Sequence, residues 1–247
     1  EQMLAAKIHG ADAAFAARPF DQSVGLMTPD GTPRELLLPW RTTSALLSGS
    51  KYLGAIRLPQ GSENRMFVTP GGDVLMVVWN DKPTREVIYL GSDVRVIDVW
   101  GREQQPAKQE HRDVIDVDVM PTFIRGLNPY VARWRVGVRF TDQHVPSVFG
   151  KAHYNSLEFH NEFPQGVGGV ATVHAPEGWQ VGPPQLDFKL SPGSAARPRF
   201  SLTLPLDANS GREPMRVDFL LTADQRYQFS VYRDLVVGDG QVELQVH

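Results

Sequence analysis

Apolar and polar residues alternate with a period of two through most of the chain after its first fifty residues. In one stretch, Ile115, Val117 and Val119 fall on one side of an extended segment, whereas Asp116 and Asp118 point to the other. Successive side chains of a β-strand point to opposite faces of the sheet, so this pattern predicts strands with one apolar and one hydrated face. The chain is therefore expected to be mainly β.

Short apolar runs bounded by Gly, Pro, Asn or Asp define the strands of a first module. They are predicted at Tyr52–Leu58, Arg65–Thr69, Val74–Trp79, Arg85–Leu90, Val94–Trp100 and Asp113–Val119. Short turns at Gly71-Gly72 and Asn80–Pro83 join neighbouring runs. Because parallel strands need long crossovers, these turns favour an antiparallel sandwich over residues 51–127.

A second set of alternating segments follows the Pro- and Gly-containing passage Pro121–Pro129. Strands are predicted at Trp134–Phe140, Phe200–Leu204, Tyr227–Val231 and, after the turn Gly238–Gly240, at Val242–Val246. Short strands with Pro and Gly between them are typical of a sandwich, here over residues 128–247. In the first of these strands, Arg133, Arg135 and Arg139 form a stripe that we assign to an outward, solvated face rather than to an anion site.

Residues 1–50 differ from the rest and form a helical lead segment. A short helix is predicted over Glu1–His9, ended by Gly10, followed by a buried strand or second helix over Ala11–Phe20. Further on, Thr32, Pro33 and Glu35 have the spacing of a capping box, and apolar residues continue to Leu47. A helix is expected there, kinked or restarted at Pro39 and stopped at Gly49.

Composition excludes several classes of function. The 247 residues carry a formal net charge of −3, which gives no general attraction for nucleic acid. There is no cysteine, so disulfides, thiolate catalysis and thiolate metal sites are excluded. The longest apolar runs have strand length, far below the ~20 residues of a membrane-spanning helix. No nucleotide-binding or nucleophile-elbow motif is found, and no cofactor is expected.

Punctuating residues of the second module recur in an order that resembles a known family. Asn161 precedes a glycine-containing strand, Val167–Ala175, which leads into the turn Pro176-Glu177-Gly178-Trp179 and on to Ser191-Pro192-Gly193. This order resembles the bacterial immunoglobulin-like module that lies C-terminal to some alpha-galactosidases and other glycoside hydrolases. The resemblance covers roughly residues 152–234 and implies an immunoglobulin-like fold for the second sandwich.

The first module is similar in outline to the small β-sandwich that follows the catalytic barrel of many glycoside hydrolases. The similarity rests on the Gly49–Gly54 motif, the strand Val74–Trp79, and the segments Asp98–Gly101 and Pro121–Ile124. It implies that Ala11–Leu47 is the last strand and helix of a mostly absent barrel. A complete (β/α)₈ barrel takes ~250 residues and draws its catalytic residues from several strands. Fewer than about fifty residues of this chain could belong to one, so the chain cannot assemble the paired carboxylates of a glycosidase in that fold.

These resemblances imply a non-catalytic accessory region of a secreted carbohydrate-processing enzyme, extracellular or periplasmic. Its partners would be the catalytic domain of the same parent protein and a weakly bound polysaccharide. We expect no catalysis by this chain alone. The alternative is a stand-alone adhesion-type sandwich that binds a glycan or a protein. An unfamiliar sandwich enzyme would instead need a pocket that gathers Asp98, Asp113 and a histidine.

Sugar recognition needs exposed aromatic rings, on which a pyranose stacks its C–H face. Trp100, Tyr130, Tyr154 and Tyr232 lie near strand ends or at outward positions, and we predict that they contact a ligand. Trp79 and Trp134 lie on apolar faces and are assigned to the cores.

Metal and catalytic sites are not predicted. The seven histidines show no short metal-binding pairing, and His153 and His160 are seven residues apart in an extended segment. Asp113, Asp116 and Asp118 could offer oxygens to calcium but lack the glycine turn and distal acid of a calcium loop. We favour a solvated strand face for these acids.

Overall fold

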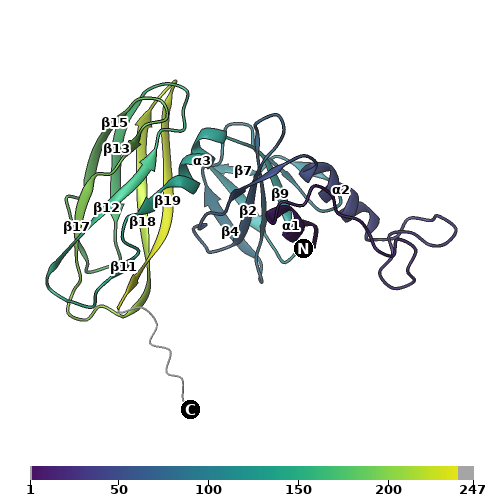
Figure 1. The fold of residues 1–247 in the computed structure, drawn as a ribbon, viewed down its shortest axis with the longest axis horizontal. Helices are drawn as coiled ribbons and strands as arrows, with labels where there is room; N and C mark the ends of the chain where they lie inside the picture. Colours follow the sequence, from purple (N-terminus) through teal and green to yellow (C-terminus); the bar gives the residue numbers. More distant parts are fainter. Residues whose placement is uncertain (1, 239–247) are drawn as a thin grey trace, which may run out of the picture. The chain divides into compact units, whose positions relative to one another are not determined.

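The computed structural model describes residues 2–238 of the chain (Figure 1). It is mainly β, with 44% of residues in strands and 11% in helices. The fold prediction of consecutive β-sandwiches after a short helical segment is confirmed. The predicted strand Val242–Val246 and His247 lie outside the described residues. The chain divides into two compact units, residues 1–132 and 133–247, and each is described by itself.

Two antiparallel sheets form the body of the first unit. In spatial order, the six strands of the larger sheet are β1 (Lys51–Gly54), β2 (Glu63–Val68), β3 (Val74–Trp79), β9 (Thr122–Leu127), β5 (Arg95–Ile97) and β6 (Glu103–Gln104). The smaller sheet consists of β4 (Thr84–Ile88), β8 (Arg112–Val117) and β7 (Ala107–Gln109). The strand β8 ends at Val117, so Val119, which was expected on the apolar face, lies beyond the strand and is exposed.

The larger sheet of the first unit is covered on both faces. On one face, Leu75 and Val77 pack with Leu4 of helix α1 (Gln2–Ile8) and Leu47 of helix α2 (Leu37–Leu47). On the other face, Met76 and Val78 line a small void together with residues of β4 and β8. A strand buried on both sides needs apolar residues at every position, and this accounts for the uninterrupted run Val74–Trp79.

The helical lead segment differs in part from its prediction. The first helix is present as α1, but α2 begins at Leu37, and its N-cap, Leu36, makes no side-chain capping bond. The predicted cap at Thr32 is wrong, because its backbone N–H donates to Thr28 Oγ1 in a local turn at 3.1 Å. Pro39 therefore lies in the first turn, where its missing N–H has no intrahelical acceptor, and the kink predicted there is not required.

Residues 11–20 form neither the strand nor the helix that was expected for them. The stretch between α1 and α2 is irregular, and its sole β-type pairing among the described residues is an isolated bridge between Met27 and Pro33. The composition of residues 11–20 is that of a buried element. However, no apolar surface of the first unit covers Phe15 and Phe20, which are exposed.

The second unit is a sandwich of two sheets. In spatial order, one sheet consists of β11 (His144–Val145), β19 (Arg226–Val237), β18 (Gly211–Thr222), β13 (Val167–His174) and β15 (Gln185–Leu190). The other consists of β10 (Arg139–Phe140), β12 (Ala152–His160), β17 (Arg199–Thr203) and β14 (Gln180–Gly182), with β16 (Ala195–Ala196) also paired to β12. All pairs are antiparallel except β11 with β19.

The strand predicted at Trp134–Phe140 is wrong, because most of this segment belongs to helix α3 (Pro129–Gly137). Asn128 caps this helix: its Oδ1 accepts the backbone N–H groups of Tyr130 and Val131, both at 3.0 Å. A capping Asn followed by Pro at the first helical position is a strong helix start. This local signal outweighs the alternation of apolar residues that follows it.

The predicted arginine stripe does not exist as one solvated face. Arg135 is buried, with its guanidinium 5.4 Å from the centre of the Phe229 ring and its Nε donating to Ser230 O at 3.0 Å. Arg139 lies on β10 and pairs with Glu158. Residues 133 and 135 lie on helix α3, where they point in different directions, and Arg139 lies on β10, so the stripe is dispersed.

Trp134 is the centre of the second core, as its predicted assignment to a core required. Its ring lies 5.4–6.3 Å from five aromatic rings, those of Phe159, Phe163, Phe188, Phe219 and Phe229. These rings come from both sheets, so one helical side chain fills the space between them. At the end of α3, Arg233 of β19 donates to the carbonyl oxygens of Arg135, Val136 and Val138, which satisfies acceptors that the helix leaves open.

We expect Trp134→Ala to lower the free energy of unfolding of the second unit by about 3–5 kcal/mol, because the deletion leaves a large cavity among the phenylalanines. Denaturant titration measures this loss. Tyr154→Ala is the matched control, since Tyr154 lies in the same unit, is 81% exposed, and leaves no cavity when it is removed. Equal losses for the two variants would contradict the central role of Trp134.

Candidate functional site

The four predicted ligand-contacting aromatics do not converge on one site. Trp100 and Tyr130 belong to the first unit, and Tyr154 and Tyr232 to the second. Within the second unit, Tyr154 lies opposite Ser201 in one sheet, whereas Tyr232 lies in the other sheet. Tyr154 is 81% exposed and Trp100 46%. Sugar contact by each of these residues stays a prediction.

Trp100 lies in a tight turn organised by Asp98. The Asp98 carboxylate accepts the backbone N–H groups of Trp100 at 3.0 Å and Arg102 at 2.9 Å, and pairs with the Arg102 guanidinium. Burial raises the pKa of Asp98, but the hydrogen bonds and charge of Arg102 outweigh it, so the pKa lies below its usual value. The Arg102 guanidinium lies 5.3 Å from the centre of the Trp100 ring, so the cation already covers one face of this aromatic.

Asp98 and Asp113 do not share a pocket. Asp113 is fully buried, where it pairs with Lys108 and accepts the backbone N–H of Leu90 at 3.0 Å. Because Asp113 is buried, paired and hydrogen-bonded, its carboxylate is not exposed to a ligand. Within residues 2–238, no group of three or more His, Asp or Glu side chains could hold a metal ion.

Ser, Asp and His side chains do meet in the second unit, on the sheet that contains β13, β18 and β19. Ser230 Oγ donates to Asp218 Oδ1 at 2.6 Å, and His174 Nε2 lies 2.9 Å from Asp218 Oδ2. The carboxylate therefore lies between the hydroxyl and the imidazole. A nucleophilic serine needs the imidazole as its own hydrogen-bond partner, so this cluster is not a catalytic triad.

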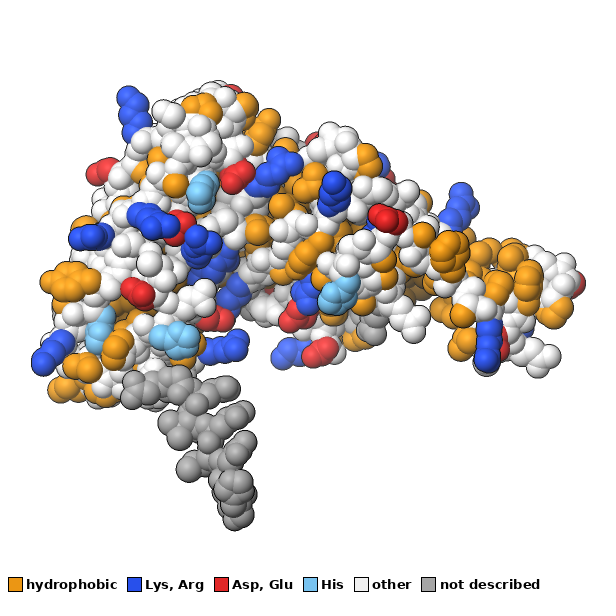
Figure 2. Space-filling view, viewed as in Figure 1, with side chains coloured by type: hydrophobic (Ala, Val, Ile, Leu, Met, Phe, Trp, Pro, Cys, Tyr) orange, Lys and Arg blue, Asp and Glu red, His pale blue; other side chains and the backbone are white. Residues whose placement is uncertain are grey.

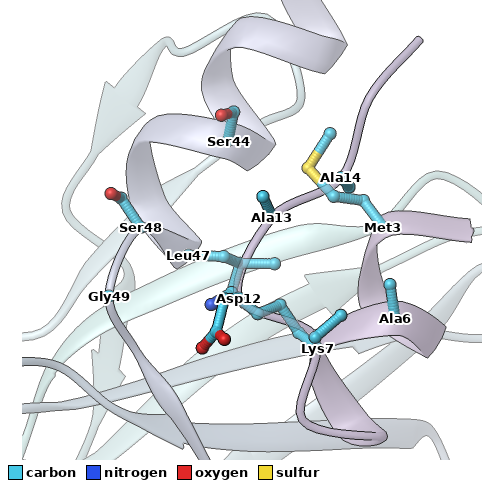
Figure 3. Close-up of a pocket in the computed structure, with 11 residues that line it drawn as sticks. Met3, Ala6, Lys7, Asp12, Ala13, Ala14, Ser44, Leu47, Ser48 and Gly49 are labelled. Atoms are coloured by element: carbon cyan, nitrogen blue, oxygen red, sulfur yellow. The ribbon is translucent and has the colours of Figure 1, made fainter.

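A cavity of about 200 Å³ lies in the first unit between α1, residues 11–14 and the end of α2 (Figure 3). Ser44 and Ser48 line it from α2, and Lys7 and Asp12 line it from the opposite side. Lys7 Nζ reaches the carbonyl oxygen of Ser50 at 3.5 Å. No aromatic side chain is among the described residues that line this cavity, so it offers no stacking surface for a sugar.

A second cavity, of about 180 Å³, lies in the second unit. It is bounded by residues 142–146 and by His153, Tyr154 and Asn155 of β12, with Leu202 beneath them. Of the four predicted ligand-contacting residues, Tyr154 is the one that borders a described cavity. We did not predict from the sequence that Asp142 and His144 line a cavity. The pairing of β10 with β12, which brings them there, joins distant segments.

A nearly buried carboxylate on β12 lies near two arginine side chains and one histidine side chain. Glu158 pairs with Arg139 at 2.6 Å and Arg197 at 3.0 Å, and His160 Nε2 lies 3.8 Å away. Burial raises the pKa of Glu158, but hydrogen bonds from Arg139 and Arg197 outweigh it, so the pKa lies below its usual value. Through these ion pairs, Glu158 links β10 and the segment before β17 to β12.

No protein-family model matches the chain, and no curated protein does. Among solved structures, a family 39 glycoside hydrolase from Bacteroides cellulosilyticus is similar at a TM-score of 0.36 and 18% identity, over 41% of this chain and 22% of that one.

Two further structures are similar over 43% of this chain. The Salmonella enterica SafA pilin in complex with the SafB chaperone has a TM-score of 0.29 at 17% identity, with 56% of that chain covered. The PapD-like domain 7 of human CEP192 has a TM-score of 0.27 at 13% identity, with 87% covered. All of these TM-scores are below 0.5, so the likenesses decide nothing about activity or ligand.

No helix within residues 2–238 is long and apolar enough to cross a membrane. The chain spans about a fifth of the glycoside hydrolase and about half of the pilin–chaperone chain.

We expect Glu158→Gln to lower the thermal midpoint most at neutral pH. The folded pKa of Glu158 is lower than the unfolded value of about 4.3, so its contribution is complete above that value and is lost as the pH falls through the folded pKa. The difference between wild type and variant should therefore shrink below about pH 4. Thermal melts across this range measure it, with the exposed Glu177→Gln as control. A difference that is constant with pH would contradict the ion-pair assignment.

Proposed function

We propose that the chain is a non-catalytic accessory region of an exported carbohydrate-processing enzyme, and that it packs against the catalytic domain through residues 11–38. One observation carries this proposal: five of the twelve exposed large hydrophobic side chains of the described residues fall in this stretch. They are Phe15, Phe20, Val24, Leu36 and Leu38. We refer to residues 11–38 as the apolar segment.

The apolar segment has an ordered backbone without a core of its own. The N–H groups of Leu26 and Met27 donate to Pro19 O at 2.8 and 2.9 Å, and Arg34 N donates to Leu26 O at 2.9 Å. The Arg34 side chain also donates to Asp21 O at 3.1 Å. These bonds fix the path of the chain, while the large apolar side chains point away from it. Phe15 is 89% exposed.

Such a concentration of apolar surface indicates contact with another protein surface. Hydrophobic side chains gather over this segment, at the right of the view (Figure 2). Single exposed hydrophobics are ordinary on a protein surface, but clusters mark interaction sites. The partner we favour is the catalytic domain implied by the sequence resemblance. The interpretation of Ala11–Leu47 as the last strand and helix of that barrel is wrong, because residues 11–20 form no strand and Leu47 packs in the core of the first unit.

The chemistry of the described residues supports a non-catalytic role. The acidic groups with strong contacts are engaged in structure: Asp98 in a turn, Asp113 with Lys108, and Glu158 with two arginines. Glycoside hydrolysis needs two carboxyl groups that flank one bond, with one free to give a proton and one free to attack or to activate water. The cavities at Asp12 and at Asp142 each contain a single carboxylate.

We expect the triple substitution of Phe15, Val24 and Leu36 by Ser to reduce binding of an apolar fluorescent dye to the chain. Each side chain is exposed, so the free energy of unfolding should change by no more than about 0.5 kcal/mol per site. The matched control replaces three exposed apolar residues elsewhere, Val119, Met120 and Leu206, by Ser. A loss of several kcal/mol in the first variant would show that the segment packs on its own chain and would overturn the docking role.

We also expect the chain alone to hydrolyse no member of a panel of nitrophenyl glycosides. The physical reason is that the cavities at Asp12 and at Asp142 each hold a single carboxyl group, whereas glycoside hydrolysis needs two. Release of nitrophenolate measures the reaction, and a known glycosidase serves as positive control. Turnover above the rate without protein would refute the accessory role.

A further inference from the structure

The strand β15 forms an open edge of the sheet that contains β13, β18 and β19. It pairs with β13 on one side and with no described strand on the other (Figure 1). The second unit has four strands at the ends of its two sheets, and β15, with six residues, is the longest of them. A bare edge of this length offers a row of main-chain donors and acceptors to another strand.

The register of β15 with β13 decides which main-chain groups face this edge. Val173 N donates to Pro184 O at 2.8 Å, so the hydrogen-bonded pairs between the two strands continue at every second residue from there. The N–H and C=O groups of the residues in between, Gln185, Asp187 and Lys189, therefore point away from β13. They make no hydrogen bond with any described residue.

The side chains of β15 alternate between the two faces of the sheet. Asp187 and Lys189 are exposed on the outer face, whereas Leu186 and Phe188 point to the inner face. Neither Asp187 nor Lys189 makes an ion pair or a side-chain hydrogen bond with a described residue. The Phe188 ring packs 5.0 Å from the Phe159 ring, yet its residue is only partly buried. The edge thus has two opposite, unpaired charges on one face and a partly covered ring on the other.

These features complement themselves in one register. When two copies of β15 pair antiparallel with Phe188 opposite Phe188, each Asp187 faces the partner's Lys189 on the same side of the sheet. In this register the edge-facing groups of Asp187 and Lys189 also meet in hydrogen-bonded pairs, and the two Phe188 rings cover each other. A register centred on Asp187 would instead place two carboxylates opposite each other, which is unfavourable. The charges therefore disfavour other strands and select a second copy of this chain.

We propose that the chain forms a two-fold symmetric dimer in which the β15 edges of two copies pair and join their sheets into one continuous sheet. A surface that pairs with itself closes after two copies, so no longer chain of copies is formed. The contact is short, and we expect a dissociation constant on the order of 100 μM. The edge lies within the second unit and does not involve the apolar segment. The dimer can therefore fail while the docking role stands, and the reverse.

The test is sedimentation equilibrium of the full chain from about 5 μM to about 1 mM, a range that brackets the expected dissociation constant. The measurement is made on the wild type and on the variant with Phe15→Ser, Val24→Ser and Leu36→Ser, in which the apolar segment cannot drive association. We expect the same monomer–dimer equilibrium in both. A monomer at every concentration, assemblies larger than a dimer, or loss of the dimer in the triple variant would each overturn the proposal.

An exchange of charges tests the register. Lys189→Glu and Asp187→Lys each place like charges opposite one another, so each should weaken the dimer at least about tenfold. The double variant Asp187→Lys with Lys189→Asp restores both ion pairs and should associate within about threefold of wild type. Both side chains are exposed, so the thermal midpoint of the monomer should not change in any of these variants.

Lys151→Glu is the matched control for net charge, because Lys151 is an exposed lysine of the same unit outside β15. It should associate as wild type. Equal association in Lys189→Glu and Lys151→Glu would show that β15 is not the interface. Failure of the double variant to recover would show that the pairing centred on Phe188 is wrong.

Discussion

The second unit depends on one helix, α3, whose free backbone groups are bound by side chains at both ends. At the start of α3, Asn128 accepts two backbone N–H groups, and at its end the Arg233 guanidinium donates to carbonyl oxygens. Between these points the helix projects Trp134 into the space between the two sheets. Burial lowers the pKa of Arg233, and the charge of Asp234 opposes this shift in part. The sandwich is thus centred on a residue that does not come from a strand.

In the first unit, the constraint is that one sheet has two faces to cover. The three-stranded sheet covers one face, and α1 with α2 covers the other. Because both helices pack against this sheet, the stretch that joins them has no apolar surface to pack on. The exposure of Phe15 and its neighbours follows from this division of the available surfaces.

The sequence predicted about half of the strands, those whose signal is local, and missed others, among them β9, β12 and β18. Alternation and turn residues located segments such as β3, β4 and β17 to within a few positions. The segment after Pro129 misled, because Trp134, Val136, Val138 and Phe140 alternate while Val131, Trp134 and Val138 also follow a helical spacing. The pair Asn128-Pro129 decides between these two patterns, and giving weight to that cap would have identified the helix.

The candidate site was less accessible to sequence reasoning than the fold. Exposure of Tyr154 could be expected from its outward position on a strand, but its neighbours could not. Asp142 and His144 reach the cavity because a two-residue strand joins one sheet and the next two-residue strand joins the other. Such short pairings carry no periodic signal. Their register is set by long-range partners, here Glu158 and Val236.

The docking role proposed for the apolar segment has a further consequence for how a partner would be supplied. Contacts through a handful of side chains give modest affinity between free molecules, because association costs translational and rotational freedom. A partner in the same polypeptide would be present at a millimolar effective concentration, at which even such a small surface stays covered. Tethering would then keep these side chains from contact with other proteins, and the covalent link would matter as much as the fit.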